Sequence, residues 1–372
     1  MSPFMIRVSA RACSLGIAAL ACLLAAPALA GTVDYEMVPV GNPGNANDIS
    51  RLSWTSAVFG AVDSNYQIGK FDVTIGQYTA FLNAVDPTGT NPNGIYNASM
   101  GTDLNIAGIS YTSGAAAGSK YSVMTVSGSA PNGGVSDANR PITYVSWFDA
   151  ARFANWMSNG QGNGSTETGA YTLNNATSGN AVVANAGAAF TLPTENQWYK
   201  AAYYDPTLNG GSGGYFTYAT QSNTAPGNVA GATANQANYN YEVFSTSQSM
   251  WYSTSQNYLT DVGAFTDSES FYGTFDQSGN VWQWYDLDGA SGSSTRGGFW
   301  WNPSYWLSSS GRQAYGPSYE GNDTGFRLAG PAALPVPEID PSSFGSAFAL
   351  LIGSLGWMER RTRRVLEVVT AA

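Results

Sequence analysis

Gly279-Asn280-Val281-Trp282-Gln283-Trp284 is the stretch of this sequence that says most about the fold, and Arg296-Gly297-Gly298 and Gly325-Phe326-Arg327 follow it. Large aromatic rings gain most by burial, so we predict that Trp282 and Trp284 are core residues. A buried guanidinium needs an acidic partner, so we predict that the arginines of the second and third blocks form buried ion pairs. The three blocks therefore indicate a packed core late in the chain.

Upstream of these blocks, three segments begin with the same helix-start chemistry. A hydroxyl residue stands three places before a polar residue in Thr74-Ile75-Gly76-Gln77, Ser146-Trp147-Phe148-Asp149 and Thr194-Glu195-Asn196-Gln197. This spacing is typical of a capping box, in which the two side chains bond each other's backbone amides. Apolar residues follow each start at helical spacing. We predict three short amphipathic helices that begin after the three hydroxyl residues.

Helical periodicity is scarce elsewhere. Residues 86–139 and 158–189 are rich in Gly, Asn, Ser and Ala, and a strand-like piece lies at 121–126. Such composition is typical of long loops and hairpins. We therefore expect most of the chain between the helices to be loop.

The three late blocks and three earlier ones, at residues 66–74, 141–150 and 192–195, occur in the order typical of one known family. In these blocks the chain resembles the formylglycine-generating enzyme, or sulfatase-modifying factor, family over roughly residues 35–330. The resemblance implies an α+β fold, an irregular variant of the C-type lectin architecture that is loop-rich, with few short helices and strands. It also implies one domain over residues 31–330.

Enzymes of that family oxidise a sulfatase cysteine to formylglycine with two active-site cysteines, which bind copper and activate oxygen. In this chain Asn302 and, approximately, Leu307 stand in their places. The chain has two cysteines, Cys13 and Cys22, both near its start, and no histidine. Because Cu(I) needs soft thiolate ligands, we expect no copper site and assign no catalytic residue. The sequence leaves open whether the protein is an enzyme, and the absence of the two family cysteines favours a non-catalytic domain.

Two pairs of carboxylates are the remaining catalytic candidates. Asp286 with Asp288, or Glu195 with Asp149, could in principle act on a glycosidic bond. Nothing in their spacing distinguishes them from structural or solvated acids. We therefore favour the structural interpretation.

The resemblance further implies a structural calcium ion. Calcium takes hard oxygen ligands, and the family binds it through side chains and backbone carbonyls just before the Arg-Gly-Gly block. Gln283 stands where a carboxylate is usual, which predicts weaker binding. The alternative is that the acidic residue caps a turn and Gln283 packs beside its neighbouring tryptophans. The implied ligands are Asp276, Gly279, Val281 and Gln283 at one site and Asn238 and Tyr239 at a second.

An aromatic cluster follows the Arg-Gly-Gly block, where the family places its substrate groove. Aromatic rings can stack on sugar rings or peptide side chains, which makes a ligand groove a reasonable hypothesis. The alternative is that the rings are core, and we expect this of at least one of the two adjacent tryptophans. The groove candidates are Trp300, Trp301, Asn302, Tyr305 and Trp306.

Both ends of the chain carry targeting signals. Residues 1–30 have the basic, apolar and small-residue order of a secretory signal peptide. Residues 331–343 form a linker with Val336-Pro337-Glu338, residues 344–358 an apolar segment and residues 359–372 a basic tail. This layout resembles a PEP-CTERM sorting signal, which implies an exosortase as partner and a transient membrane segment; the alternative is an ordinary tail anchor.

The charge balance limits the partners. Residues 31–330 contain 21 Asp or Glu and 9 Lys or Arg, a net charge of −12, so we expect no nucleic-acid partner. Together these features predict a secreted or cell-surface protein, exported through the inner membrane and associated with the surface or an exopolysaccharide. Its domain is expected to be non-catalytic and to bind a glycan or a protein. The alternative is an enzyme of the same superfamily that uses other residues.

Overall fold

The computed structural model describes residues 32–50, 58–125, 136–289 and 295–332. The predicted signal peptide, the apolar segment at 344–358, the basic tail and all but the start of the 331–343 linker lie outside these residues. Over the described ranges, no helix combines the length and the apolar character that crossing a membrane requires.

The described residues form a mixed α/β fold with few short helices and strands. The helices are α1 (Ile75–Val85), α2 (Ser99–Thr102), α3 (Trp147–Ser158), α4 (Glu195–Tyr203) and α5 (Leu208–Gly211), with the 3-10 helices η1 (Pro92–Gly94), η2 (Asp137–Asn139) and η3 (Ser304–Leu307). The strands are β1 (Met37–Val40), β2 (Tyr66–Gly69), β3 (Ile109–Tyr111), β4 (Tyr121–Val123), β5 (Tyr204–Asp205), β6 (Gly214–Tyr215), β7 (Asn240–Tyr241), β8 (Val243–Phe244), β9 (Trp282–Trp284), β10 (Thr295–Arg296), β11 (Thr324–Phe326) and β12 (Ala329–Pro331). The predicted α+β class and loop-rich character are confirmed.

The three longest helices begin where the sequence predicts. In α1 the Gln77 amide donates to the Thr74 hydroxyl at 3.2 Å, and the Thr74 amide donates to the Gln77 side chain at 2.9 Å. The same reciprocal pair opens α3 at Ser146 and α4 at Thr194. Each box satisfies two backbone amides that the helix itself leaves without partners.

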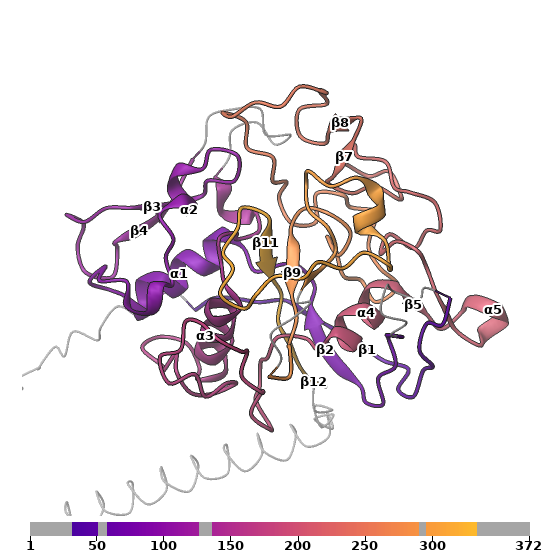
Figure 1. Cartoon of the computed structure of the whole chain (residues 1–372), viewed down its shortest axis with the longest axis horizontal. Helices are drawn as coiled ribbons and strands as arrows, with labels where there is room; N and C mark the ends of the chain where they lie inside the picture. The colour runs from indigo at the N-terminus through magenta and orange to yellow at the C-terminus, as the bar shows by residue number, and fades with distance from the viewer. Residues whose placement is uncertain (1–31, 51–57, 126–135, 290–294, 333–372) are drawn as a thin grey trace, which may run out of the picture.

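The fold contains two small three-stranded sheets, and one of them links the two ends of the described chain. In the first, β1 and β12 both pair antiparallel with β2, so the first and last strands flank the same neighbour (Figure 1). In the second, β10 pairs antiparallel and β11 parallel with β9. Segments far apart in the sequence therefore meet through very short ladders.

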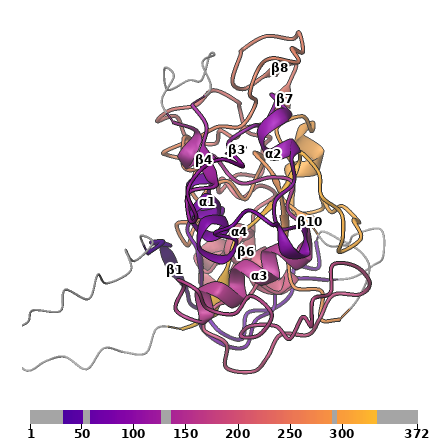
Figure 2. The ribbon, with the colours of Figure 1, turned by 90° about the vertical axis from the view of Figure 1, so that its left-hand side faces the viewer.

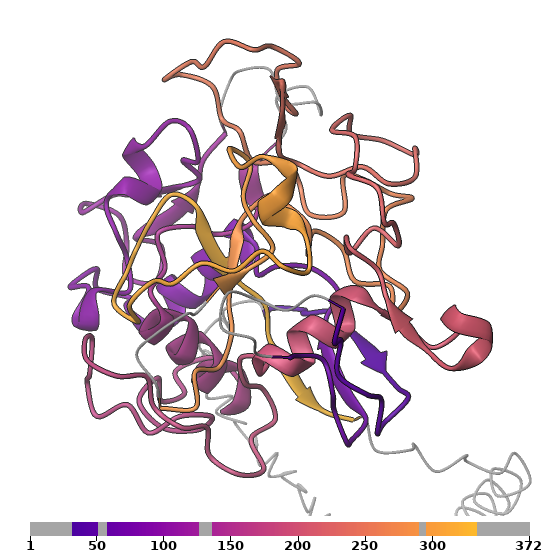
Figure 3. The same cartoon turned by 45° about the vertical axis from the view of Figure 1, so that its right-hand side comes forward.

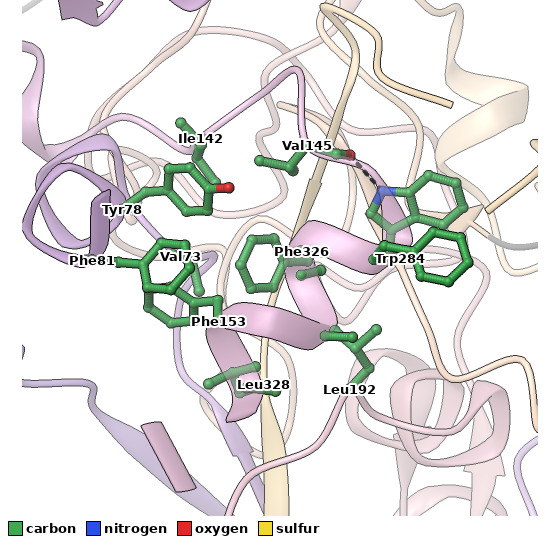
Figure 4. Packing of buried hydrophobic residues seen from close by; sticks show 14 of the residues in the cluster. Val73, Tyr78, Phe81, Ile142, Val145, Phe153, Leu192, Trp284, Phe326 and Leu328 are labelled. Atoms are coloured by element: carbon green, nitrogen blue, oxygen red, sulfur yellow. Dashed lines mark hydrogen bonds between the residues drawn. The ribbon is translucent and has the colours of Figure 1, made fainter. Parts of the chain in front are cut away.

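The main core lies between α1, α3 and the β9–β11 pair. The Phe153 ring packs edge-on against Phe326 at 5.4 Å and against Phe81 at 5.4 Å (Figure 4). The Trp284 indole donates to the Val145 carbonyl at 2.8 Å. In Figures 1 and 2 α1 and α3 lie on the same side of the molecule, and both present apolar faces to this core.

The long segments between the helices are mostly loop, as predicted. Residues 159–190 contain only turns, bends and irregular backbone. The strand-like piece at 121–126 corresponds to β4, which pairs with β3 as a hairpin. The one-turn helix α2 was not predicted, because four residues are too few to show helical periodicity.

Candidate functional site

The aromatic cluster after the Arg-Gly-Gly block divides between core and surface. Trp300 is 1% exposed and stacks on Tyr258 with ring centroids 4.6 Å apart, whereas Trp301 is 41% exposed. Trp300 is therefore the core member that we expected among the two adjacent tryptophans, and its ring is enclosed by Tyr258, Phe244 and their neighbours. The Trp301 ring lies against it, with the two ring centroids 5.2 Å apart, and forms the exposed member of the pair.

An exposed apolar surface surrounds Trp301, and sequence reasoning did not foresee most of it. The Tyr252 ring lies 4.5 Å from the Trp301 ring and is 43% exposed, and the preceding Trp251 is 78% exposed. We call Met250, Trp251, Tyr252 and Trp301 the aromatic surface. Residues 250–252 follow the β7–β8 hairpin, which lies at the top of the molecule in Figure 1, and Figure 3 shows the same end from another side.

The other predicted groove residues flank this surface. Tyr305 in η3 is exposed, and Trp306 is half-buried with its ring edge-on to Trp282 at 6.0 Å. Asn302 accepts at its carbonyl from the Asn240 amide at 3.1 Å, which holds β7 beside the aromatic segment. Its side chain accepts from the Phe299 amide at 3.1 Å.

A buried framework holds the aromatic surface in place. Phe244 lies beneath it, with its ring edge-on to Trp301 at 5.5 Å. The Asn105 amide group donates to the carbonyls of Ser253 and Gln256, at 2.9 and 2.8 Å, and its oxygen accepts from the Tyr252 hydroxyl. The Tyr252 and Trp301 rings are thus fixed by buried contacts, which lowers the entropy lost when a ligand binds.

The surroundings of the aromatic surface carry almost no charge. Neither residues 243–260 nor residues 297–311 contain Asp, Glu, Lys or Arg. Burial, with a smaller contribution from the Asp103 carboxylate, raises the pKa of Tyr252.

Each arginine of the described residues pairs with a carboxylate elsewhere: Arg140 with Asp137, Arg152 with Glu167, Arg296 and Arg312 with Glu195, and Arg327 with Asp72. The last two blocks thus supply buried ion pairs, as predicted.

Asn302 and Leu307, which we predicted to stand at the positions of the family's cysteines, have no redox-active side chain. Leu307 is fully buried against Tyr218, Ala237 and Tyr239. The Asn302 side chain accepts from the Phe299 amide, as described above. No cluster of three or more His, Cys, Asp or Glu suited to a metal occurs among the residues that the structure describes.

The first predicted calcium site is occupied by a hydrogen-bond network. The Gln283 side-chain oxygen accepts from the Trp198 indole and from the Arg327 guanidinium, both at 2.7 Å. Because these partners can only donate, they fix the orientation of the amide. Its NH₂ group therefore faces the Asp276 carbonyl and donates to it at 2.8 Å. An NH₂ group cannot ligate a cation, so Gln283 does not fit a calcium ligand in this arrangement.

The other predicted calcium residues do come together. Asn238 accepts at its carbonyl from the Asn280 amide at 2.8 Å. Gly279 has φ +93°, and a Cβ there would lie 2.3 Å from that carbonyl oxygen, so only glycine fits. Tyr239 and Val281 are buried. The Asp276 carboxylate accepts from the Gly263 amide at 2.7 Å, and burial raises its pKa to about 6. Calcium binding remains an implication of the family resemblance, and the orientation of the Gln283 amide opposes it.

Three of the candidate carboxylates line one cavity of about 600 Å³, and two of them, Glu195 and Asp286, are held by structural bonds. Glu195 accepts from Arg296 at 2.7 Å and from Arg312 at 2.6 Å. Asp286 accepts from the Tyr171 hydroxyl at 3.1 Å and from the Asp288 amide at 2.9 Å, and burial raises its pKa. Asp149 lies elsewhere, buried in the capping box of α3. The cavity thus joins Glu195 to Asp286 and Asp288 but not to Asp149.

The fold and this site define a loop-rich, mixed α/β domain without a thiol or an imidazole at the predicted centre. Residues 55–332 match the family model of the sulfatase-modifying factor enzyme 1-like domain, and the chain belongs to this family. A search of curated protein sequences gives no significant match.

Several solved structures are similar in fold. Treponema denticola variable protein 1 is 17% identical with a TM-score of 0.44, covering 81% of this chain and 97% of its own. CarF is 20% identical with a TM-score of 0.46, covering 81% and 99%. PvdO from Pseudomonas aeruginosa is 16% identical with a TM-score of 0.39, covering 80% and 92%.

Proposed function

We propose that this protein is exported to the cell surface or an exopolysaccharide matrix, where its sulfatase-modifying-factor-like domain binds a glycan or a protein without catalysing formylglycine formation. The observation that carries the proposal is the aromatic surface. Two adjacent rings, Tyr252 and Trp301, remain 43% and 41% exposed although buried side chains fix their positions, and Trp251, next to Tyr252 in the chain, is 78% exposed. Exposed rings on a rigid support are typical of recognition sites.

The non-catalytic part of the proposal is supported by the chemistry at the family's cysteine positions. Asn302 and the buried Leu307 cannot hold Cu(I), which requires soft ligands. Incubating the full-length protein with cysteine-containing sulfatase peptides, copper and oxygen should leave the peptide mass unchanged. Formylglycine formation above the protein-free control would overturn this part and favour an enzyme that uses other residues.

Binding is tested by retention on surface polymers. The full-length protein should be retained by a cell-surface polymer or protein fraction, and Trp301→Ala should abolish retention. Phe271→Ala is the matched control, because Phe271 is also exposed but packs against Tyr272 and not against the aromatic surface. Retention that both variants preserve would exclude the aromatic surface as the binding site.

Export and sorting belong to the same proposal and rest on the sequence of the two ends. We propose cleavage of residues 1–30, transient membrane retention through residues 344–358 and processing by an exosortase. Removing residues 331–372 should release the protein from the cell surface into the medium, as measured by cell fractionation. Unchanged surface retention of the truncated chain would contradict the sorting role of the tail.

A further inference from the structure

We infer that the ligand of the aromatic surface is an uncharged polysaccharide. This inference deepens the proposed binding function and rests on it. Three properties of the surface select the ligand class: the exposed rings, the absence of charge around them, and the hydroxyl groups beside them.

Two of the exposed rings contact each other, and the third belongs to the chain neighbour of Tyr252. Trp301 and Tyr252 are tilted by 45° at a centroid separation of 4.5 Å, so together they form an angled apolar face. Trp251 precedes Tyr252 directly and is the most exposed aromatic side chain of the described residues. The apolar C–H face of a sugar ring packs against an aromatic ring, and a polysaccharide repeats that face along its length.

The charge distribution disfavours ionic polymers. A polymer of uronic acids or phosphate diesters needs lysine or arginine, and neither residues 243–260 nor residues 297–311 contain one. The described lysines are equally remote in sequence, at Lys70, Lys120 and Lys200. The net negative domain would repel such a polymer, and nothing on this surface would compensate.

A cationic polymer or basic peptide is disfavoured by the state of the nearest carboxylate. Asp103 accepts from the Tyr144 hydroxyl at 2.7 Å, the Asn105 amide at 3.1 Å and the Asn322 amide group at 3.3 Å. Its oxygens are therefore already engaged in hydrogen bonds within the protein. Glu242, in the β7–β8 turn, is the other nearby acid, and a single exposed carboxylate contributes little to binding.

Neutral hydrogen-bonding groups complete the surface. Ser253, Thr254 and Ser255 follow Tyr252 directly, and all three are exposed. Hydroxyl groups both donate and accept, so they match sugar hydroxyls without requiring a charge on the ligand. The surface thus offers aromatic rings to the C–H faces, and hydroxyl groups to the polar edges, of an uncharged sugar chain.

Affinity electrophoresis of the full-length protein tests the inference with four polymers. Hydroxyethyl cellulose and galactomannan are neutral, alginate is acidic and chitosan is cationic. We expect retardation by at least one neutral polymer, little change when salt is raised, and at least tenfold weaker retardation for Trp301→Ala and Tyr252→Ala. Phe271→Ala should behave as the natural chain, and circular dichroism checks that each variant is folded.

The outcomes separate the inference from the proposed function. Retardation by alginate or chitosan alone, lost in Trp301→Ala, would overturn the neutral-ligand inference and leave the binding function standing. Retention of a protein partner that depends on Trp301 would do the same. No Trp301-dependent binding to any polymer or protein would overturn both.

Discussion

Two tryptophans that lie in neighbouring blocks of the sequence have opposite surroundings. Trp284, in β9, is fully buried and donates its N–H to the Val145 carbonyl. The Trp301 ring packs against Tyr252 and Phe244, and 41% of the residue's surface remains exposed. The buried sheet around β9 has its interactions completed within the protein, whereas the aromatic surface is rigid but incomplete. Stability and recognition thus depend on different members of one residue type.

The largest expected effect on stability comes from removing the buried tryptophan of this comparison. Trp284→Ala removes a ring from the main core and leaves the Val145 carbonyl without its donor, so we expect a loss of about 3 to 5 kcal/mol in the free energy of unfolding. Urea denaturation followed by fluorescence or circular dichroism measures it. A loss below about 1 kcal/mol would show that the core around β9 repacks.

Gln283→Glu tests the hydrogen-bond network of the same sheet. The substitution replaces the N–H donor that faces the Asp276 carbonyl with an oxygen, so we expect a loss of about 1 to 3 kcal/mol without metal. The new carboxylate and the nearby carbonyl offer hard oxygen ligands, so millimolar calcium should restore the thermal midpoint of this variant.

The natural chain is the control for calcium. Because its Gln283 presents NH₂ to the Asp276 carbonyl, we expect the same midpoint with calcium and with a chelator. A calcium-dependent rise that Asp276→Ala abolishes would instead establish the calcium site implied by the family resemblance.

The helix starts and the buried arginines could be predicted because their signals are local. A capping box lies within four residues, and an arginine in a dense aromatic block needs a carboxylate wherever the chain provides one. The aromatic surface could be predicted only in part. Tyr252 and its neighbours lie in a loop without periodicity, and their position depends on Asn105, 147 residues away along the chain.

The division between adjacent tryptophans was also beyond sequence reasoning. Trp300 and Trp301 are chemically identical and consecutive, so only the backbone decides which faces Tyr258 in the interior. The amide of Gln283 is similar, because its orientation is decided by Trp198 and Arg327, which come from distant segments. Long-range partners determine both features.

Removing an N-cap should have a moderate effect. Ser146→Ala removes the hydroxyl that accepts from the Asp149 amide at the start of the buried helix α3, and we expect a cost of about 0.5 to 2 kcal/mol. Asn163→Ala, in an exposed turn, is the control and should change stability by less than about 0.5 kcal/mol. Equal costs would contradict the structural role of the cap. Chemical denaturation of both variants decides.

The smallest effect on stability is expected on the exposed side of the comparison. Trp301→Ala removes a ring that already contacts water, so its cost should stay below about 1 kcal/mol while ligand binding is lost. Denaturation and affinity electrophoresis of the same preparation measure the two quantities. A loss as large as that of Trp284→Ala would mean that Trp301 belongs to the core and would remove the contrast between the regions.

The pairing of β12 with β2 sets the order in which this chain can fold. β12 is the last described strand, and the buried Arg327 beside it pairs with Asp72, 255 residues earlier. A ribosome must therefore release almost the whole domain before its first sheet can close, and the closing contacts span nearly its full length. Such high contact order is typical of slow folding, over milliseconds to seconds or longer. Until then β2 keeps an unpaired edge, which makes the incomplete chain dependent on protection from aggregation.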